Sequence, residues 1–483
     1  GQRAIVPSFW GIDEERDIFQ LDVEHHVSST DFGVGLRYEA SEQDNRRYER
    51  RRPFEAQDRH LTHREGVETD LFNVHAYTIT PITDTILFTS GYAFTTLDTD
   101  IFGTRIYGSD YDAIYDPLFA RRQQRDEGFL NLTGGSRVDQ HVAHLNLMLT
   151  PWEHFTIVPS FRLEVQDQTG EALFDETNFG GPPAFAEIRD PLYNTRERNL
   201  IDVSEGLELR YTGVTNWVFY TRGEWLQGEG DLSEREFDAL TGGLDLARDS
   251  DSTRFTQKYV AGVNWYPARR FNLSGQYYFK SRQNDYDHPL DTSANAGGDR
   301  YPAFIRGQDF DTHDVNFRVT VRPASRVTFV SRYDFQISKI HNGMDLLEEV
   351  EGSESIAHIF GQSITWTPFN RLYLQGSVNY VLDQLRTPAT GILPDGTVQD
   401  SENDYINLTL LAGLALTEKT DLQAQYFLYY ANNWEDNSLV GVPYNADAEE
   451  HGVTATVIHK ISPAQQLTLR YGYFTNREDT YGG

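Results

Sequence analysis

The residues best suited to chemistry in this sequence are three pairs of an arginine and an acid, each spaced two residues apart. Residues i and i+2 share one face of a β-strand, so each pair would lie on one wall of a sheet. If that wall lined a channel, the pairs would set the electric field met by a passing solute or protein. We favour ion pairs that neutralise one another on a wet wall, because balanced charges select weakly by sign. The pairs are Arg162/Glu164, Arg222/Glu224 and Arg332/Asp334.

Composition limits the class of protein. The 483 residues carry a net charge of -31, and the pI is near 4.7, which argues against a nucleic-acid partner because phosphate binding needs a basic surface. No run approaches the roughly 18 consecutive apolar residues of a membrane helix. The low mean hydropathy of -0.55 still permits a membrane β-barrel, since only alternate residues of each strand meet lipid.

Aromatic and cysteine usage point the same way. Aromatic residues make up 13% of the chain, as expected for aromatic girdles at two membrane surfaces or for an aromatic-rich soluble β protein. Cysteine is absent, which excludes disulfides, thiolate metal sites and covalent Cys-x-x-Cys-His haem attachment on this chain. We find no nucleophile elbow, phosphate loop or Ser/His/Asp arrangement, so we predict no enzyme activity.

Short polar breaks divide the chain into pairs of long alternating runs, as hairpin turns do. In TWTPFNRLYLQGSVNY (365–380), for example, Leu372, Leu374, Val378 and Tyr380 alternate with polar residues. Nine such hairpins predict about eighteen strands. Their arms are 16–27/31–41, 69–80/83–97, 137–150/153–167, 196–212/215–230, 252–266/269–282, 307–322/325–339, 353–367/370–385, 401–417/420–433 and 446–461/464–478.

The connections between hairpins are long, polar and acidic, and we predict them to be loops. They cover 42–68, 98–136, 168–195, 231–251, 283–306, 340–352, 386–400 and 434–445. Short turns at one end and long loops at the other are typical of outer-membrane barrels. The pattern places both ends of the chain on the long-loop side, so we expect either about twenty strands in a complete protein or a return of residues 1–15 through the lumen.

Alternation assigns the two faces of the predicted strands. We predict lumen-facing positions at Arg162, Glu164, Arg222, Glu224, Lys280, Arg332, Asp334, Gln375, Asn379 and Arg470. We predict lipid-facing positions at Phe161, Leu163, Phe219, Trp225, Tyr277, Phe279, Phe329, Tyr333, Leu372, Leu374, Val378, Tyr380, Leu469 and Tyr471.

The predicted fold is therefore all-β: a transmembrane antiparallel up-and-down barrel of about 18–20 strands, with short periplasmic turns and long extracellular loops. Residues 1–483 form one domain, in which 1–15 are an N-terminal segment and 16–480 hold the strands and loops. The predicted location is the bacterial outer membrane, with the lipid bilayer and lipopolysaccharide as partners.

Some loop residues could bind ligands. Arg46-Arg47-Tyr48-Glu49-Arg50-Arg51-Arg52 could contact lipopolysaccharide phosphates, fold into the pore or dock an acidic partner, and a solvated patch is an equal interpretation. Asp110, Asp112 and Asp116 could gather oxygens around Ca²⁺, although their spacing matches no strict calcium loop. His60 and His63 could bind a metal in a loop, whereas His141 and His144 fall on opposite faces of a strand. We predict no metal or cofactor site otherwise.

Two stretches support a family resemblance. TPFNRLYLQGSVNY and YPARRFNLSGQYYF, together with the loop GTRIYGSDYDAIYDPLFA, resemble the barrels of the MtrB/PioB type. The Cys-x-x-Cys that some members carry near the N-terminus is missing. Members of that family sheathe a periplasmic multihaem cytochrome that crosses the outer membrane, often capped by an extracellular cytochrome. The resemblance implies an electron conduit whose haem belongs to the partner; the alternative is a porin for small solutes.

Overall fold

The computed structural model describes residues 8–49, 59–107, 127–179, 187–292, 305–344, 350–386, 400–435, 444–462 and 465–481. The described residues form eighteen β-strands in one sheet. The strands are β1 Ser8–Val27, β2 Thr30–Glu49, β3 Arg59–Thr83, β4 Ile86–Tyr107, β5 Glu127–Trp152, β6 Phe155–Phe179, β7 Glu187–Tyr211, β8 Trp217–Asp238, β9 Leu244–Ala268, β10 Phe271–Asp291, β11 Ile305–Ala324, β12 Val327–Met344, β13 Val350–Phe369, β14 Leu372–Arg386, β15 Asp400–Ala415, β16 Thr420–Glu435, β17 Tyr444–Ser462 and β18 Gln465–Tyr481. No helix long and apolar enough to span a membrane occurs in these ranges.

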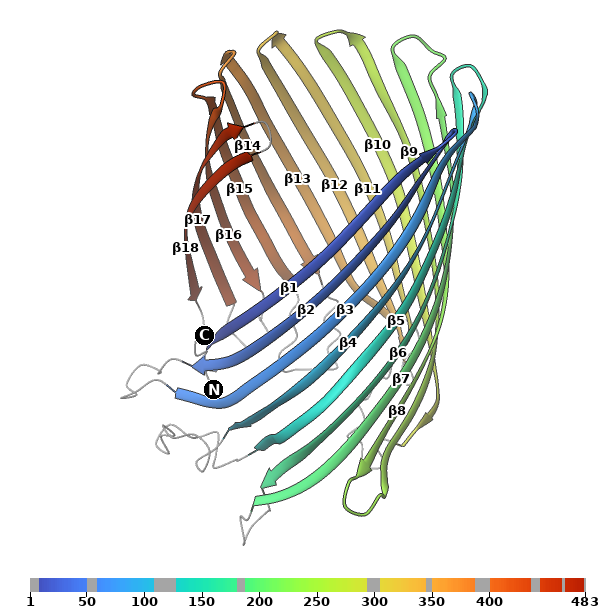
Figure 1. The fold of residues 1–483 in the computed structure, drawn as a ribbon, viewed down its shortest axis with the longest axis vertical. Helices are drawn as coiled ribbons and strands as arrows, with labels where there is room; N and C mark the ends of the chain where they lie inside the picture. Colours follow the sequence, from blue (N-terminus) through green and yellow to red (C-terminus); the bar gives the residue numbers. More distant parts are fainter. Residues whose placement is uncertain are drawn as a thin grey trace.

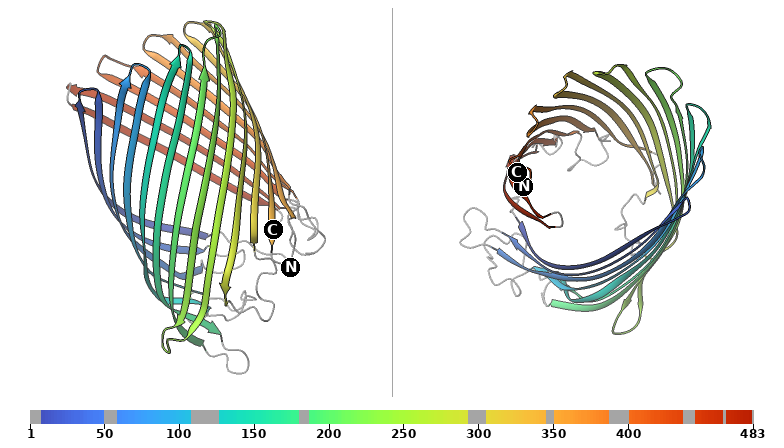
Figure 2. Two further views of the ribbon diagram at one scale, coloured as in Figure 1. Left: turned by 90° about the vertical axis from the view of Figure 1, so that its right-hand side faces the viewer. Right: turned by 45° about the horizontal axis from the view of Figure 1, so that its top comes forward.

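Each strand pairs antiparallel with the next strand in the chain, from β1 to β18. The sheet curls into a barrel around an open interior, and the short turns gather at one end of it (Figures 1 and 2). This up-and-down order confirms the predicted fold. For eighteen strands spaced about 4.8 Å apart and tilted by about 40°, the backbone diameter is about 35 Å.

Strands β1 and β18 are the two edges of the sheet. No hydrogen-bonded pairing between them is recorded within the described residues, and the side chains of residues 11–27 and 465–477 are exposed. The two strands run antiparallel to one another, as direct pairing requires. Because unpaired backbone groups are costly in lipid, we expect both edges to be paired in the membrane.

The predicted hairpins are present, and eight of the nine turns fall within the described residues, but the five that contain Pro lie two or three residues later than predicted. Pro368 and Phe369, for instance, end β13, and Asn370-Arg371 joins it to β14. The turn between β17 and β18 includes residues 463–464, which lie outside the described ranges. In five of the described hairpins a Pro lies within the last three residues of the first strand, at a shift in register, where it needs no ladder hydrogen bond.

Most of the predicted loops contain strand residues, and this part of the sequence interpretation was wrong for them, whereas 386–400 and 434–445 do lie between consecutive strands. The stretch 98–136 contains the last part of β4 and the first part of β5, and 231–251 is mostly β8 and β9. Strand β1 likewise begins at Ser8, inside the segment predicted to precede the barrel. These strand ends mix polar and apolar residues on both faces, so they lack the alternation that reveals a half-buried strand, yet their backbones still pair.

The strands are consequently far longer than a membrane requires. They run from 15 residues in β14 to 26 in β5, whereas about 9–11 residues suffice to cross a bilayer as a tilted strand. Much of the acidity lies on the outer parts of these strands, not in loops as predicted. We call the paired strand ends beyond the apolar band the collar; Asp98 and Asp139 belong to it.

An apolar band surrounds the barrel on the turn side of the collar. Outward positions in β4 and β5 near the turns include Ile86, Phe88, Leu145 and Leu149, and the same pattern repeats in the other strands. Trp217 and Trp265 stack at the turn end, with ring centroids 5.3 Å apart. An up-and-down antiparallel sheet curled into a barrel, with an outward apolar band and an aromatic girdle, is the architecture of a bacterial outer-membrane barrel, and the outer membrane is where this protein resides.

Candidate functional site: the inner wall of the barrel

The ten predicted lumen-facing residues all lie on one face of the sheet. Register establishes this strand by strand, since directly opposed residues share a face. Glu164 opposes Asp202, Glu224 opposes Lys258, and Arg332 opposes Gly361. The fourteen predicted lipid-facing residues lie on the other face; Phe161 opposes Leu145, and Leu374 opposes Trp366.

Crowding identifies the polar face as the concave one. Side chains on the inside of a curved sheet converge and cover one another, whereas those on the outside spread apart. Asp202, Asp314 and Asp334 are only 6–7% exposed although they are acids, while Tyr277 and Tyr380 on the opposite face are 42–43% exposed. The polar face therefore lines the interior of the barrel.

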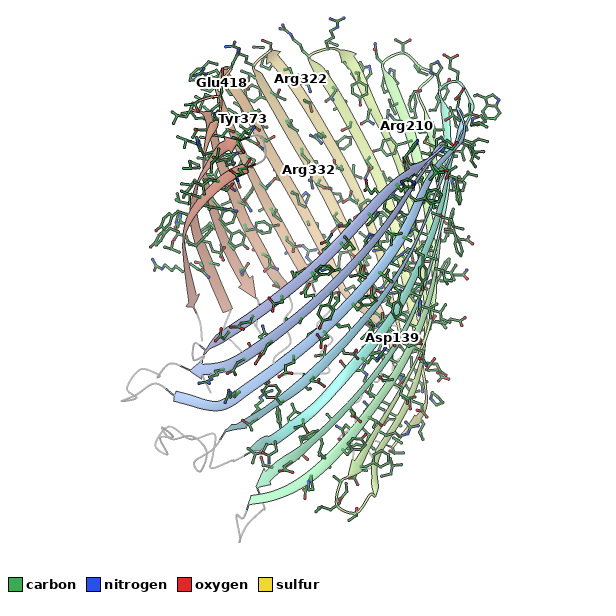
Figure 3. The ribbon with its side chains drawn as sticks, viewed as in Figure 1. Asp139, Arg210, Arg322, Arg332, Tyr373 and Glu418 are labelled. Atoms are coloured by element: carbon green, nitrogen blue, oxygen red, sulfur yellow. The ribbon has the colours of Figure 1, made fainter. Side chains whose placement is uncertain are left out.

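One nearly buried charged group on this wall is the carboxylate of Asp334 in β12. Arg332 donates to its Oδ2 at 2.7 Å, and Asn316 donates to the same oxygen at 2.7 Å. Its Oδ1 is buried without a hydrogen-bond partner. Arg332 lies about midway along the drawn wall, and Arg322 lies at the turn end (Figure 3). Two strands and one cation thus hold this carboxylate on the wall.

Asp314 lies beside this cluster on β11. It opposes Tyr278 on one side and Gln336 on the other, and the Gln336 amide donates to the Tyr278 hydroxyl at 2.8 Å. The ammonium of Lys258 lies 4.6 Å from the centre of the Tyr278 ring, a cation–π contact. Buried acids on the inner wall therefore have cationic or amide neighbours drawn from β9 to β12.

The other predicted pairs also form ion pairs. Arg162 contacts Glu164 at 2.7 Å, and Gln140 adds a hydrogen bond of 2.5 Å to that carboxylate. Arg222 pairs with Glu224 within β8. Sequence analysis missed a further pair, Arg254 with Asp202, because its partners lie on β9 and β7 and are far apart in the chain. The described wall thus balances its charges locally and forms no single-sign ring.

Small residues and rings make part of this wall smooth. The His144 ring lies over Gly91 and the Tyr220 ring over Gly262, each directly across a strand pair. A Cβ at Gly91 would come within 2.2 Å of His144, and one at Gly262 within 2.1 Å of Tyr220. Glycine is therefore needed at both positions for the ring to lie flat on the wall.

Several sequence candidates lie outside the described residues. These are Asp110, Asp112 and Asp116, together with Arg50, Arg51 and Arg52 and the side chains of Arg47, His60 and His63. Arg46, by contrast, is part of β2 and not of a loop. His141 and His144 lie on opposite faces, as predicted, since His141 opposes Phe94 and His144 opposes Gly91. No cluster of three metal-ligating side chains occurs in the described part of the chain.

An outward ion pair gives the collar a predicted pH dependence. Arg64 donates to both carboxylate oxygens of Asp44, at 3.1 and 3.0 Å, and this hydrogen bonding holds the pKa of Asp44 below its ordinary value. The pair therefore stabilises the folded collar fully above the unfolded pKa of about 4. This stabilisation is lost as the pH falls through the lower pKa of folded Asp44.

We expect amide hydrogen exchange, corrected for intrinsic rates, to speed up in residues 42–46 and 64–66 between pH 6 and pH 3. Residues 71–79, deeper in β3, serve as the internal reference and should keep their protection. In Asp44→Asn the exchange at residues 42–46 should already be fast at pH 6. Equal protection of the native segment at both pH values would contradict the prediction.

No family model and no curated protein matches the sequence. Solved structures resemble the chain in shape. The copper transporter OprC matches with a TM-score of 0.48 and 10% identity over 98% of this chain and 72% of its own. The ferric yersiniabactin uptake receptor FyuA from Yersinia pestis matches with a TM-score of 0.46 and 10% identity over 99% and 79%.

The RagAB peptide importer in its 'closed-closed' state matches with a TM-score of 0.47 and 11% identity over 89% of this chain. The chain spans 62% of the length of that importer chain. None of these three is described as an electron conduit, so the resemblance to the MtrB/PioB type stays a prediction. At such identities the likeness says nothing of a substrate.

Proposed function

We propose that the barrel sheathes a multihaem c-type cytochrome and insulates it from lipid, so that electrons cross the outer membrane through the partner. The length of the wall supports this proposal most. A 25-residue strand such as β6, tilted by about 40°, rises about 60 Å. The apolar band of an outer-membrane barrel is only about 25 Å tall. A haem chain gains from a long sheath, whereas a diffusion pore gains nothing from added length.

The chemistry of the inner wall is also compatible with a protein occupant. Several of its acids are paired with arginines on the same strand or two strands away, as in Arg162/Glu164 and Arg254/Asp202. Such a wall offers polar contacts without a strong field that would select small ions. Every element of the described chain belongs to the wall itself. The chain has no cysteine, so covalently held haem would have to come from the partner.

The same wide polar interior keeps a second function open, a porin for small solutes. The sheath and the porin predict different results for the barrel purified from native membranes. The sheath predicts that an affinity-tagged barrel elutes with a c-type haem absorbance spectrum in fixed ratio to barrel. A barrel that elutes without haem and conducts ions in a planar bilayer would be the porin.

A matched pair of variants locates the contact. Ser377 and Thr409 oppose one another on the inner wall, where their side chains are small. In Ser377→Arg/Thr409→Arg we expect the haem-to-barrel ratio to fall severalfold, because two long cations project into the space of the occupant. Ser377→Ala/Thr409→Ala should retain the native ratio. An unchanged ratio in the arginine variant would place the cytochrome outside the lumen.

A further inference from the structure

Four tyrosine–histidine pairs repeat on the outward face of the barrel. In each pair the Tyr hydroxyl lies 2.7–2.9 Å from the His Nδ1 on the next strand. We call these pairs the Tyr–His belt. Its members are Tyr92/His141, Tyr277/His313, Tyr333/His358 and Tyr426/His451.

All four pairs lie at the same level of the barrel. Each Tyr is the seventh residue of its strand, counted from Ile86, Phe271, Val327 and Thr420. Each His lies eleven residues before the last residue of its strand, Trp152, Ala324, Phe369 or Ser462. Because the turns share one end of the barrel, the belt forms a partial ring at one height, on β4/β5, β10/β11, β12/β13 and β16/β17.

This level is the boundary between the apolar band and the collar. In β4 and β5 the outward residues on the turn side of the belt are mostly apolar, such as Phe88 and Leu145, and the outward acids Asp98 and Asp139 lie beyond it. Eight residues separate His358 from Trp366, which marks the turn-side girdle, so the two levels are about 20 Å apart. With periplasmic turns, the belt lies at the headgroups of the outer leaflet.

The geometry of each pair leaves one ring nitrogen for a ligand. A Tyr hydroxyl that donates to Nδ1 keeps the neutral imidazole proton on Nε2, so Nε2–H is the donor that remains. The rings are held in place by an aromatic residue directly opposite, with centroids 4.8–4.9 Å apart for Phe94/His141, Phe279/His313 and Phe335/His358. Tyr hydroxyls in such girdles usually contact lipid headgroups, but in the belt each one is hydrogen-bonded to its histidine.

In the fourth pair, a carboxylate already accepts a hydrogen bond at the Nε2 position. Nε2 of His451 is bonded to the Glu449 carboxylate at 2.9 Å. For the other three histidines of the belt, no partner of Nε2 is recorded among the described residues. Acids just beyond two of them are already paired: Asp139 with Arg137 at 2.9 Å, and Glu354 with Lys339 at 3.2 Å. An arriving anion would therefore meet neutralised carboxylates at these two positions.

We propose that His141, His313 and His358 donate Nε2–H to phosphate oxygens of outer-leaflet lipid headgroups. The occupant is the phosphorylated lipid of the bilayer, because the three donors lie on the convex face at the edge of the apolar band. The belt then sets the height of the barrel in the membrane and leaves the collar outside it. This assignment is independent of what occupies the lumen.

Lipid retention tests the assignment. The detergent-extracted barrel is exchanged into bisphosphorylated lipid A or into the same lipid without phosphates, and retained lipids are counted by native mass spectrometry. We expect severalfold more of the phosphorylated lipid on the native chain. In His141→Phe/His313→Phe/His358→Phe this excess should disappear. The matched control is His75→Phe/His144→Phe, whose rings lie on the inner face and should not affect retention.

A conservative variant and a spectroscopic measurement complete the test. Gln at the three positions can accept from Tyr and still donate, so it should retain most of the excess. Imidazole ¹⁵N shifts of the native barrel should show the Nε2–H tautomer and change with phosphorylated lipid only. Equal retention of both lipids, an unaffected Phe variant, or an Nδ1–H tautomer would each overturn the proposal.

Discussion

Val378→Lys should lower the free energy of unfolding of the barrel in liposomes by about 2–4 kcal/mol, the cost of a lysine near the bilayer midplane. Val378 lies on the convex face, midway between the levels of Trp366 and His358, where it opposes Gln362 on β13 and Leu408 on β15. A cation there has no water and no acid within the apolar band. The measurement is denaturant unfolding of the reconstituted barrel, with heat-modifiable migration on gels as a second readout.

The neighbouring residue provides the control. Asn379 lies next in β14 but on the inner wall, so Asn379→Lys keeps its charge in water and should change stability by less than about 0.5 kcal/mol, as surface substitutions usually do. Equal costs for the two lysines would contradict the assignment of the two faces. A larger loss of stability for the lysine on the inner wall would mean that the lumen-facing and lipid-facing sides are assigned the wrong way round.

Arg332→Leu should be the most destabilising single change on the inner wall, with a loss of about 1–3 kcal/mol, as expected when a nearly buried carboxylate loses the hydrogen bond from a half-exposed guanidinium. Arg332 is the cation bonded to Asp334, which is 7% exposed and lies beside the buried Asp314. Without the guanidinium, two nearly buried carboxyl groups remain close together. Unfolding in denaturant at pH 7 measures the loss.

Two further variants separate charge from packing. In Arg332→Leu/Asp334→Asn the buried charge is removed with its partner, so a large part of the stability should return. Arg222→Leu breaks the equivalent pair in β8, but the Glu224 side chain there is 35% exposed, so water can compensate and the loss should be smaller. If both arginine variants lose the same stability, burial at Asp334 does not govern the effect.

The sequence was enough to predict the strand order and the two faces. Turns such as Pro368-Phe369-Asn370-Arg371 are local, and alternation beside the apolar band is a local signal as well, so neither needs information from distant strands. The extent of the strands could not be predicted in the same way. In 98–107 and 127–136 both faces meet water, and the pairing that makes these residues strands comes from neighbours.

The two features with the most functional content depend on register. Arg254 and Asp202 lie on β9 and β7, and the pair exists only once β8 is placed between them. The Tyr–His belt has a weak sequence signal, a Tyr seven residues into a strand and a His twelve residues before the next turn. The sequence alone does not show that these residues form pairs, because the strand register is needed to bring Tyr92 next to His141.

The most direct test of the sheath is the shielding of its inner wall, and the absence of native cysteine makes a single introduced cysteine a clean probe. Asn379→Cys is labelled with a membrane-impermeant thiol reagent in barrel extracted from native membranes, before and after the haem protein is stripped away. The account predicts slow labelling before stripping and fast labelling afterwards. Equal labelling rates in the two states would contradict an occupied lumen.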